Sequence, residues 1–565
     1  MALTRRALGG LTIGGTAAFT LAACGGNEGN GGSGAKELIW AIPSAWESWN
    51  ENTGAGNNSY GHQAMFPKTF GLDGNSSGDF DENGDFHLND AVFADAKVIN
   101  EQPFQVEYTL QENAQWSDGK PIRVEDFIFQ WYSISGNPEH ANQEQAQPAS
   151  TTYGSKIASI EASDAGVVVT FVEGHLDPEW LYSPTVYLPS HVLEANGFEG
   201  WQTDPAIMGN AIEWSEANLI DVVTGPWKPV DSKLGEYVVY EINENYQGSV
   251  KPTVEKLTMK VVEGTEAIVT ELRQGTIAGA WPSEFMQEEF DKVAEDPNLE
   301  QAVYEGGVWI HLDTNVKSEF LKDQALRQAV FTAVNVADSI SRIFPETEVS
   351  QRLNHFFGQK SEYFVDHLSA TGQGSGDVAK AAEILTAAGY TGAAEGETLK
   401  TPDGKEVKLV IRYGEGDAAR TTISELAQAQ LALIGIALEL KAIPDGELGT
   451  VLTESDFDLV VFGWSGSPTF GSAPGQYFLT DVAYGNYSFP EVDEAIAKVQ
   501  STIDVAESAA FANEVEAIVV PLALTLPFYD EPQGIVWNPT IIDGVVPNGN
   551  SQAGPIFNVV EWKNA

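Results

Sequence analysis

The pattern of apolar and polar residues changes twice along this chain, and the change limits the folds that it can adopt. The beginning and the end of the chain favour strands and loops, whereas the stretch from about residue 310 to 520 alternates between helices and strands. Such βα alternation between two strand-rich stretches indicates an α/β lobe inserted into a first lobe. We therefore predict an α/β fold with lobe I at residues 37–305, lobe II at residues 306–524 and a return to lobe I at residues 525–565. A β-rich subdomain is expected within lobe I at about residues 66–175.

Local patterns predict several individual elements. Residues 37–42 and 458–463 are apolar runs typical of buried strands, and residues 166–171 alternate as a half-buried strand does. A helix is predicted over residues 124–133, with its large apolar side chains on one side. Residues 325–343 carry apolar side chains at helical spacing, so we predict one amphipathic helix there.

The N-terminal stretch resembles an export signal followed by a tether. Residues 1–23 combine a pair of arginines with an uncharged run, which is typical of a signal peptide. The sequence Leu-Ala-Ala that ends this stretch, followed by Cys24, resembles the lipobox of bacterial lipoproteins, in which the cysteine is acylated. We predict lipidation at Cys24, a flexible Gly-rich tether at residues 24–36, and anchoring at the outer face of the bacterial cell membrane. The paired arginines leave the general secretory and twin-arginine routes both open.

The chain is strongly acidic. Its 565 residues include 81 Asp and Glu against 30 Lys and Arg, which gives a formal charge of −51. Loss of Arg5 and Arg6 with the signal peptide would leave 28 basic residues and a charge of −53. A nucleic-acid-binding surface needs clustered Lys and Arg, so the composition argues against that class of partner. The acidity indicates either adaptation to salt or an exposed acidic coat.

Catalytic motifs are missing from the sequence. It contains no H-E-x-x-H motif, and a single cysteine excludes a Cys/His zinc site. Residues 463–467 (GWSGS) look like a nucleophile elbow, but the second glycine falls one position early. Neither a G-x-x-x-x-G-K-[ST] loop nor a strand-linked G-x-G-x-x-G motif occurs. We therefore predict no enzyme activity, no cofactor and no nucleotide site.

One stretch has the spacing of a calcium ligand set. Asp79, Asp81 and Asn83 alternate before Gly84, and Asp90 follows eleven residues after Asp79, as in a twelve-residue calcium loop. The flanking residues do not form amphipathic helices, and residues 82–85 (ENGD) suit a hairpin turn equally well. We favour the hairpin turn and predict no metal site, with a weak calcium site as the alternative.

Aromatic residues give a better indication of a binding site. Several lie at strand ends or in loops rich in Gly, Ser and Pro rather than in helical stripes: Trp46, Trp49, Trp281, Trp309, Trp464 and Tyr477. Each one alone is more often part of a core or of loop packing. Several of them converging between two lobes would form a ligand cleft with flat walls and few charges.

A set of motifs follows in a fixed order along the chain. Residues 115–121 (QWSDGKP), with Val124 to Phe127 and Trp131 after them, carry a W-S-D-G-x-P…D…W pattern. Further motifs lie at Thr224–Trp227, Asn245–Gly248, Arg327–Ala333, Ala381–Tyr390, Gln430–Ile436 and Asp456–Trp464. This ordered set resembles the family 5 extracellular solute-binding proteins, the oligopeptide- and dipeptide-binding receptors of ABC importers. The resemblance covers about residues 38–540.

The resemblance implies a two-lobed periplasmic-binding-protein-like fold of type II, in its large three-subdomain variety. A hinge joins the lobes, which close around ligand, and the chain would cross between them near Tyr304–Asp313 and Leu524–Tyr529. The resemblance places ligand at the loop after the first strand, Ser44–Trp49, and around Trp464–Ser467. With Trp281 added from its loop position, the residues expected to contact ligand are Trp46, Trp49, Trp281, Trp464, Ser465 and Ser467.

The chain departs from the family at one point. Peptide-binding members often carry an acidic residue just after the Gly-Trp segment, where it pairs with the α-amino group of the ligand. Residues 464–468 (WSGSP) contain no acid. A peptide receptor can still bind main-chain amides by strand-like hydrogen bonds, but a sugar, a nickel complex or another solute fits this stretch as well.

These observations predict a lipid-anchored, monomeric substrate-binding protein of an ABC importer. It would bind oligopeptides or a related small solute in an interlobe cleft and deliver them to the permease and ATPase complex. The alternative is an envelope lipoprotein that uses the same fold as a scaffold or glycolipid-binding protein without transport.

Overall fold

The computed structural model describes most of the chain after the tether. The described residues are 37–56, 59–68, 77–142, 147–151, 153–182, 188–281, 287–345, 347–444, 447–465, 470–551 and 553–565. The predicted signal peptide, Cys24, the tether and Ser467 lie outside them. No helix within the described ranges is long and apolar enough to cross a membrane.

A ten-stranded mixed sheet runs through the molecule. Its strand order is β14-β13-β15-β12-β16-β11-β1-β10-β9-β8. The bounds are β1 Glu37–Ile42, β8 Trp227–Lys233, β9 Tyr237–Ile242, β10 Lys256–Val261, β11 Gly279–Ala280, β12 Glu300–Thr314, β13 Lys408–Gly414, β14 Ala437–Ile443, β15 Leu459–Ser465 and β16 Thr525–Trp537. In the division predicted from the sequence, β1 and β8–β11 fall in lobe I and β13–β15 fall in lobe II.

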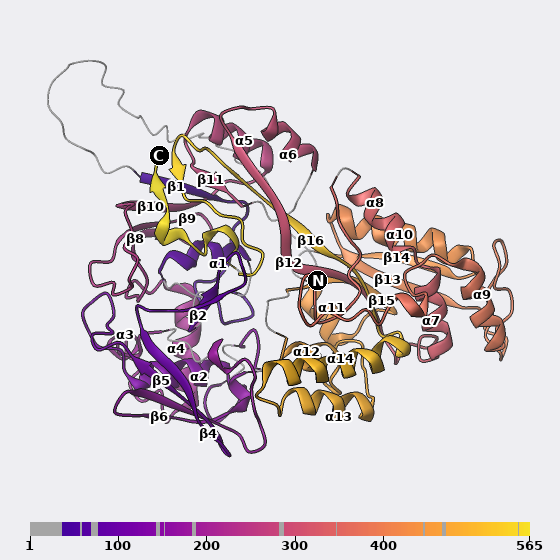
Figure 1. Cartoon of the computed structure of the whole chain (residues 1–565), viewed down its shortest axis with the longest axis horizontal. Coiled ribbons are helices and arrows are strands. Elements are labelled where there is room, and N and C mark those ends of the chain that lie inside the picture. Colours follow the sequence, from indigo (N-terminus) through magenta and orange to yellow (C-terminus); the bar gives the residue numbers. More distant parts are fainter. Residues whose placement is uncertain are drawn as a thin grey trace, which may run out of the picture.

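The strands β12 and β16 connect the two lobes. They pair antiparallel from Glu300 opposite Trp537 to Asp313 opposite Thr525. At one end β16 pairs with β11 of lobe I, and at the other end β12 pairs with β15 of lobe II. Figure 1 shows these two long strands passing through the centre, between lobe I elements on the left and lobe II elements on the right. The segments that the family resemblance placed at the crossings lie in these two strands or at their ends.

Lobe I adds smaller strand pairs and helices to its part of the sheet. A four-stranded sheet has the order β4-β5-β7-β6, and β2 pairs with β3, as β17 does with β18. The bounds are β2 Gly78–Phe80, β3 Phe86–Leu88, β4 Phe93–Glu101, β5 Phe104–Leu110, β6 Ile157–Ala162, β7 Gly166–Phe171, β17 Ile542–Asp543 and β18 Lys563–Asn564. The helices are α1 Ser59–Met65, α2 Val124–Ile134, α3 Ser190–Ala195, α4 Pro205–Ala217, α5 Thr265–Gln274 and α6 Gln287–Ala294.

Lobe II covers its sheet with helices on both faces. The helices are α7 Gln324–Ala333, α8 Val336–Ile343, α9 Val378–Ala387, α10 Ala418–Ala432, α11 Leu448–Glu454, α12 Ala473–Phe478, α13 Pro490–Val499 and α14 Val505–Leu522. Ile310 and Leu312 of β12 face a core that includes residues of α7 to α10. Trp309, which points the opposite way in the strand, belongs to a second core with α12 to α14.

The motif around Trp116 holds lobe I together. The indole N–H of Trp116 donates to the carboxylate of Asp126 at 3.0 Å. The other carboxylate oxygen of Asp126 accepts from the backbone N–H and the hydroxyl of Ser190. Because Asp126 is fully buried, these bonds offset the cost of removing its charge from water. The motif therefore fixes the start of α2 against α3.

The helix predicted over residues 325–343 is two helices, so that prediction is wrong at its centre. Val334 is extended, with a ψ of 129°, and ends α7. The side chain of Asn335 then accepts from the backbone N–H of Asp338 and caps α8. The apolar spacing runs on across the break because both helices bury residues in the same core.

The acidic stretch 79–90 forms a hairpin of β2 and β3. Asp81 accepts from the backbone N–H groups of Asn83 and Asp85, which closes the turn. Its other oxygen lies 2.9 Å from Nε2 of His87. Within the described ranges, no group of three His, Cys, Asp or Glu side chains is placed to hold a metal ion.

Candidate functional site between the lobes

The lobe II side of the site begins where β15 meets β12. β15 runs toward lobe I and ends with Trp464 opposite Trp309 and Ser465 opposite Val308. Directly paired residues share a face of the sheet, and alternate residues of a strand do so too. Trp309, His311 and Trp464 therefore project from one face, at the end of the lobe II sheet nearest to lobe I.

Together with Tyr477 and Tyr484, these residues form a layer of aromatic rings, which we call the aromatic wall. Trp464 stacks on Tyr477 at 5.1 Å between ring centres and on Tyr484 at 5.7 Å. His311 is nearly parallel to Trp464, at 6.1 Å. Trp309 and Tyr477 are buried, whereas Trp464 and Tyr484 are half-buried. Trp464 is thus held in a fixed orientation by its neighbours and still exposes part of its ring.

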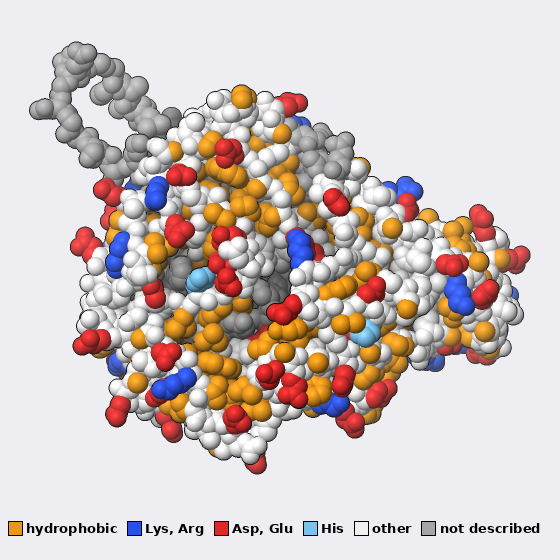
Figure 2. Space-filling model, viewed as in Figure 1, with side chains coloured by type: hydrophobic (Ala, Val, Ile, Leu, Met, Phe, Trp, Pro, Cys, Tyr) orange, Lys and Arg blue, Asp and Glu red, His pale blue; other side chains and the backbone are white. Residues whose placement is uncertain are grey.

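Figure 2 shows a hollow between the two lobes on the face that it displays, with acidic and basic side chains at its rim. Two ion pairs lie at the crossing strands. Arg352 pairs with Asp530 of β16, and its guanidinium group lies 4.8 Å from the centre of the Trp309 ring. Lys360 pairs with Glu305 of β12 at 2.5 Å. Since these four charges pair with one another, they leave little unpaired charge beside the crossing strands.

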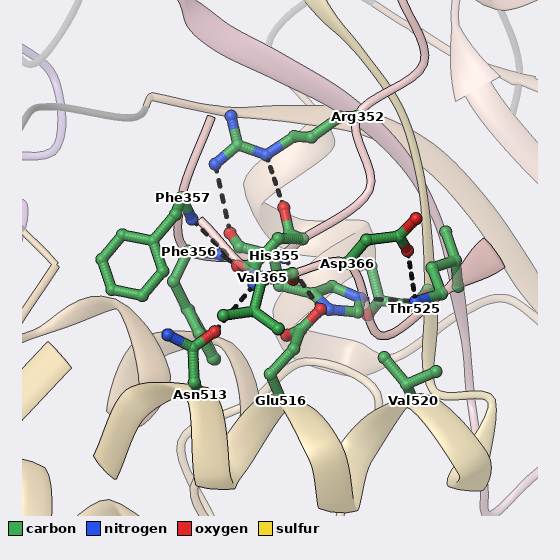
Figure 3. Close-up of polar contacts among 12 residues, drawn as sticks. Arg352, His355, Phe356, Phe357, Val365, Asp366, Asn513, Glu516, Val520 and Thr525 are labelled. Atoms are coloured by element: carbon green, nitrogen blue, oxygen red, sulfur yellow. Dashed lines mark hydrogen bonds and ion pairs between the residues drawn. The ribbon is translucent and has the colours of Figure 1, made fainter. Parts of the chain in front are cut away.

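A buried polar network holds Arg352 in place (Figure 3). Nε of Arg352 donates to the carbonyl of Asn354 at 2.9 Å. Next along the chain, Nδ1 of His355 lies 2.8 Å from Glu516 of α14, and its Nε2 lies 3.0 Å from the carbonyl of Thr525 in β16. A carbonyl oxygen can only accept, so Nε2 carries a proton. The network therefore fixes the segment from Arg352 to His355 onto both α14 and β16.

Lobe I reaches lobe II through Glu179. Its carboxyl group accepts from the backbone N–H of Phe470 and, at 2.8 Å, from that of Gly471. Burial in this contact first, and the nearby Asp177 second, raise the pKa of Glu179 to about 8. Phe470 follows Trp464 by only six residues, so the aromatic wall and this interlobe contact are close neighbours along the chain.

The predicted lobe I residues lie in the lobe I core. Trp46 and Trp49 are 2% and 6% exposed, and their rings pack edge to face at 5.7 Å. The backbone N–H of Trp49 donates to the carbonyl of Glu216, at the end of α4. Trp281 is 6% exposed and lies against Gly554, where an added Cβ would meet its ring at 2.5 Å. The described contacts of these three residues lie within lobe I, away from Trp464.

The remaining predicted residues are described only in part. Ser465 ends β15, opposite Val308, and its side chain lies outside what the structure describes. Sequence reasoning did not name Arg352, Tyr484 or Glu179. No local motif marks them, because their partners lie far away in the sequence: Glu179 and Phe470 are 291 residues apart.

The fold and the site define a two-lobed solute-binding protein, with an aromatic wall beside the strands that join the lobes. The chain belongs to the bacterial extracellular solute-binding proteins, family 5, whose middle region matches residues 91–486. This family binds solutes and does not catalyse reactions.

Individual relatives agree with this assignment. The chain is 24% identical to the oligopeptide-binding protein OppA of Mycobacterium tuberculosis over 495 residues, which cover 85% of this chain and 76% of the relative. Its fold is similar to the structure of the periplasmic EDTA-binding protein EppA, with a TM-score of 0.81, 24% identity and coverage of 95% and 98%. It is also similar to AppA of Bacillus subtilis in complex with a nonapeptide, with a TM-score of 0.71, 18% identity and coverage of 94% and 99%.

Proposed function

We propose that this chain is a lipid-anchored, extracytoplasmic substrate-binding protein of an ABC importer. It is tethered through Cys24, captures a peptide or a related small solute between its lobes, and delivers it to the permease. The observation that carries the proposal is the placement of the half-buried Trp464. It stands at the lobe I end of β15, beside the two strands that join the lobes, which supports a ligand contact there.

Binding would work by closure of the lobes about β12 and β16. A ligand that contacts both lobes binds the closed state better than the open state, and so shifts the population toward closure. In this proposal the exposed part of the Trp464 ring packs against an apolar or planar part of the ligand. Ser465 and Ser467 are proposed to supply hydrogen bonds to the ligand, while Trp46, Trp49 and Trp281 support lobe I from its core.

The relatives suggest two classes of ligand, peptides and metal chelates. OppA and AppA are described by the peptides they bind, and EppA by its binding of EDTA, a metal chelator. Residues 464–468 carry no acid to pair with a free α-amino group. We favour a peptide held by its main-chain amides, because such binding needs no charge at that point.

Native mass spectrometry of the chain from residue 25 onward, purified without refolding, tests the proposal. We expect an added mass that denaturation releases as short peptides. A single chelate or other small organic compound would keep the receptor function and change the substrate class. A bare protein that also shows no thermal shift with peptide mixtures or with Fe(III)-EDTA would contradict the proposal and favour the scaffold without transport.

The same measurement tests the wall. We expect Trp464→Ala to lose at least about nine-tenths of the added mass, because truncation of an aromatic side chain at a binding hot spot typically costs about 2 kcal/mol or more, which is roughly a 30-fold loss of affinity. Trp214→Ala is the matched control, since this half-buried Trp packs on Phe198 of lobe I. Equal retention by both variants would show that Trp464 does not contact the ligand.

A further inference from the structure

A turn of lobe I makes the contact with lobe II. The turn consists of Asp177, Pro178 and Glu179, and its two partners in lobe II are the backbone N–H groups of Phe470 and Gly471. These N–H groups lie just before α12. Burial raises the pKa of the Glu179 carboxyl group to about 8, so at neutral pH the group is mostly neutral and accepts these N–H groups in ordinary hydrogen bonds with defined geometry. The contact is therefore a directional bond between lobes and not only a packing surface.

The turn is fixed on the lobe I side. The carboxylate of Asp177 accepts from the backbone N–H of Glu179 at 2.9 Å, which sets the turn. The hydroxyl of Tyr108, in β5, donates to the carbonyl of Trp180, and the hydroxyl of Ser77 donates to the carbonyl of Leu181. Because Tyr108 and Ser77 are fully buried, the turn moves with the small sheet of lobe I.

The lobe II side is shaped to receive the turn. A Cβ added at Gly471 would lie 2.9 Å from the Glu179 carboxyl and 3.3 Å from Pro178, so only glycine allows this approach without displacement. Phe470 packs on Phe357 at 5.1 Å between ring centres. The receiving segment is therefore part of the same core as the aromatic wall.

A second connection lies beside the first. The backbone N–H of Leu176 donates to the carbonyl of Gln500, at the end of α13, at 3.1 Å. Ile503, which follows α13, packs against the core of lobe I. Figure 1 shows α12 and α13 on the side of lobe II that faces the small sheet of lobe I.

We propose that the turn of Asp177, Pro178 and Glu179 is a latch that sets the free energy of lobe closure without touching the ligand. The proposal rests on the proposed function, in which the lobes close around a solute. The latch holds Phe470 and Gly471, and Phe470 belongs to the same core as Trp309 and Tyr477, so its engagement also positions the aromatic wall. Because a ligand binds the closed state, any change in the closed population changes the apparent affinity by the same factor.

Distance measurements by electron paramagnetic resonance test the latch on the ligand-free chain. Ala162 of β6 and Ala497 of α13 are exposed, and each is replaced by a spin-labelled cysteine in the chain from residue 25 onward. That chain has no other cysteine, because its only one is Cys24. We expect a short-distance, closed population in the parent chain. Glu179→Ala should raise the ratio of open to closed molecules by about tenfold, which corresponds to about 1.4 kcal/mol, because the bonds from the backbone N–H groups of Phe470 and Gly471 are lost.

Gly471→Ala provides an independent test, because it displaces the Glu179 carboxyl group and removes no charge. It should shift the ratio in the same direction. The matched controls are Glu173→Ala, at an exposed acid near the latch, and Gly449→Ala, where nothing lies within 4 Å of the added Cβ. Both controls should leave the distances unchanged.

Unchanged distances in both latch variants would overturn the proposal, as would a parent chain with no closed population. Circular dichroism identifies a variant that has failed to fold, and Gly471→Ala then decides the question alone. This outcome can be told apart from failure of the proposed function. A protein that carries bound solute, but whose interlobe distances do not change in the latch variants, would lack only the latch. A protein without bound solute whose distances do change in these variants would have the latch but not the receptor function.

Discussion

At the scale of single residues, the carboxyl groups of Asp177 and Glu179 at the interlobe contact both have raised pKa values. Burial raises the pKa of Asp177 to about 6. Burial first and the charge of Asp177 second raise the pKa of Glu179 to about 8, although the backbone N–H groups of residues 470–472 oppose this change. The side chains of Phe470, Gly471 and Ser472 are not ionisable. The main charged neighbour of Glu179 is therefore Asp177.

Closure should accordingly depend on pH. In the open state, both acids return toward the ordinary carboxyl pKa of about 4, so closure takes up protons. The closed state is favoured at low pH and loses this stabilisation as the pH rises through about 8, the closed-state pKa of Glu179. We expect the ratio of open to closed molecules, measured by the same distance method, to rise by about threefold or more between about pH 6 and about pH 9. Glu179→Gln should flatten this dependence, and a slope equal to that of the parent chain would contradict the assignment.

The two halves of the candidate site differ in how far the sequence predicts them. Trp464 follows a buried strand in a Gly-rich stretch, and this local pattern is enough to propose a ligand wall. Trp46 and Trp49 have the same local pattern, but the lobe I core surrounds them. Local sequence cannot separate these cases, because burial depends on elements such as α4 that are remote in the chain. Glu179 could not be proposed from sequence at all, since its partners come from the other lobe.

At the scale of elements, β12 carries an irregularity where it passes from one lobe to the other. Glu305 pairs with Pro532 and Trp309 pairs with Asp530, so three residues of β12 face one of β16. Two of the three are glycines, at 306 and 307. Extra residues on one strand leave backbone groups unpaired and bend the strand, which is suited to a hinge.

A side chain in this bulge should disturb the hinge. A Cβ at Gly306 would lie 2.6 Å from the carbonyl oxygen of Glu531 and 2.6 Å from the side chain of Gln533. Because a backbone atom is in the way, β12 and β16 must separate locally. We expect Gly306→Ala to lower the apparent melting temperature by about 2 °C or more and to broaden the interlobe distances. Gly449→Ala is the control, and a Gly306 variant that matches it in both measurements would show that the bulge tolerates a side chain.

Most elements lie where the periodicity predicts them, and the exceptions have physical causes. Residues 124–133 and 166–171 match α2 and β7 closely, because their burial follows the local period. The predicted helix over 325–343 breaks at Asn335, whose capping bond competes with a continuous helix. The C-terminal stretch was predicted as short strands and loops, but β16 has thirteen residues. Its length reflects pairing with β12 in both lobes, which no local pattern encodes.

At the scale of the whole molecule, the excess of acidic residues should oppose compactness. The chain from Cys24 onward carries 81 acidic and 28 basic residues. Many of the described ion pairs, such as Lys498 with Glu514 at 2.9 Å, are exposed, and exposed pairs contribute only about 0–1 kcal/mol each. Most acidic side chains therefore have no basic residue available to them, and their mutual repulsion favours the unfolded chain.

Salt should relieve this repulsion and raise the melting temperature. The screening length falls from about 30 Å at about 0.01 M salt to about 10 Å at about 0.1 M and about 3 Å at about 1 M. We expect sodium chloride to raise the melting temperature most steeply below about 0.1 M, where long-range repulsion is lost, and more slowly above it. Sucrose at equal osmolality is the control, because it stabilises by exclusion from the surface without screening charge. If sodium chloride raised the melting temperature no more than sucrose does, the acidic surface would cost the folded state little free energy. Its charges would then already lie too far apart to repel one another.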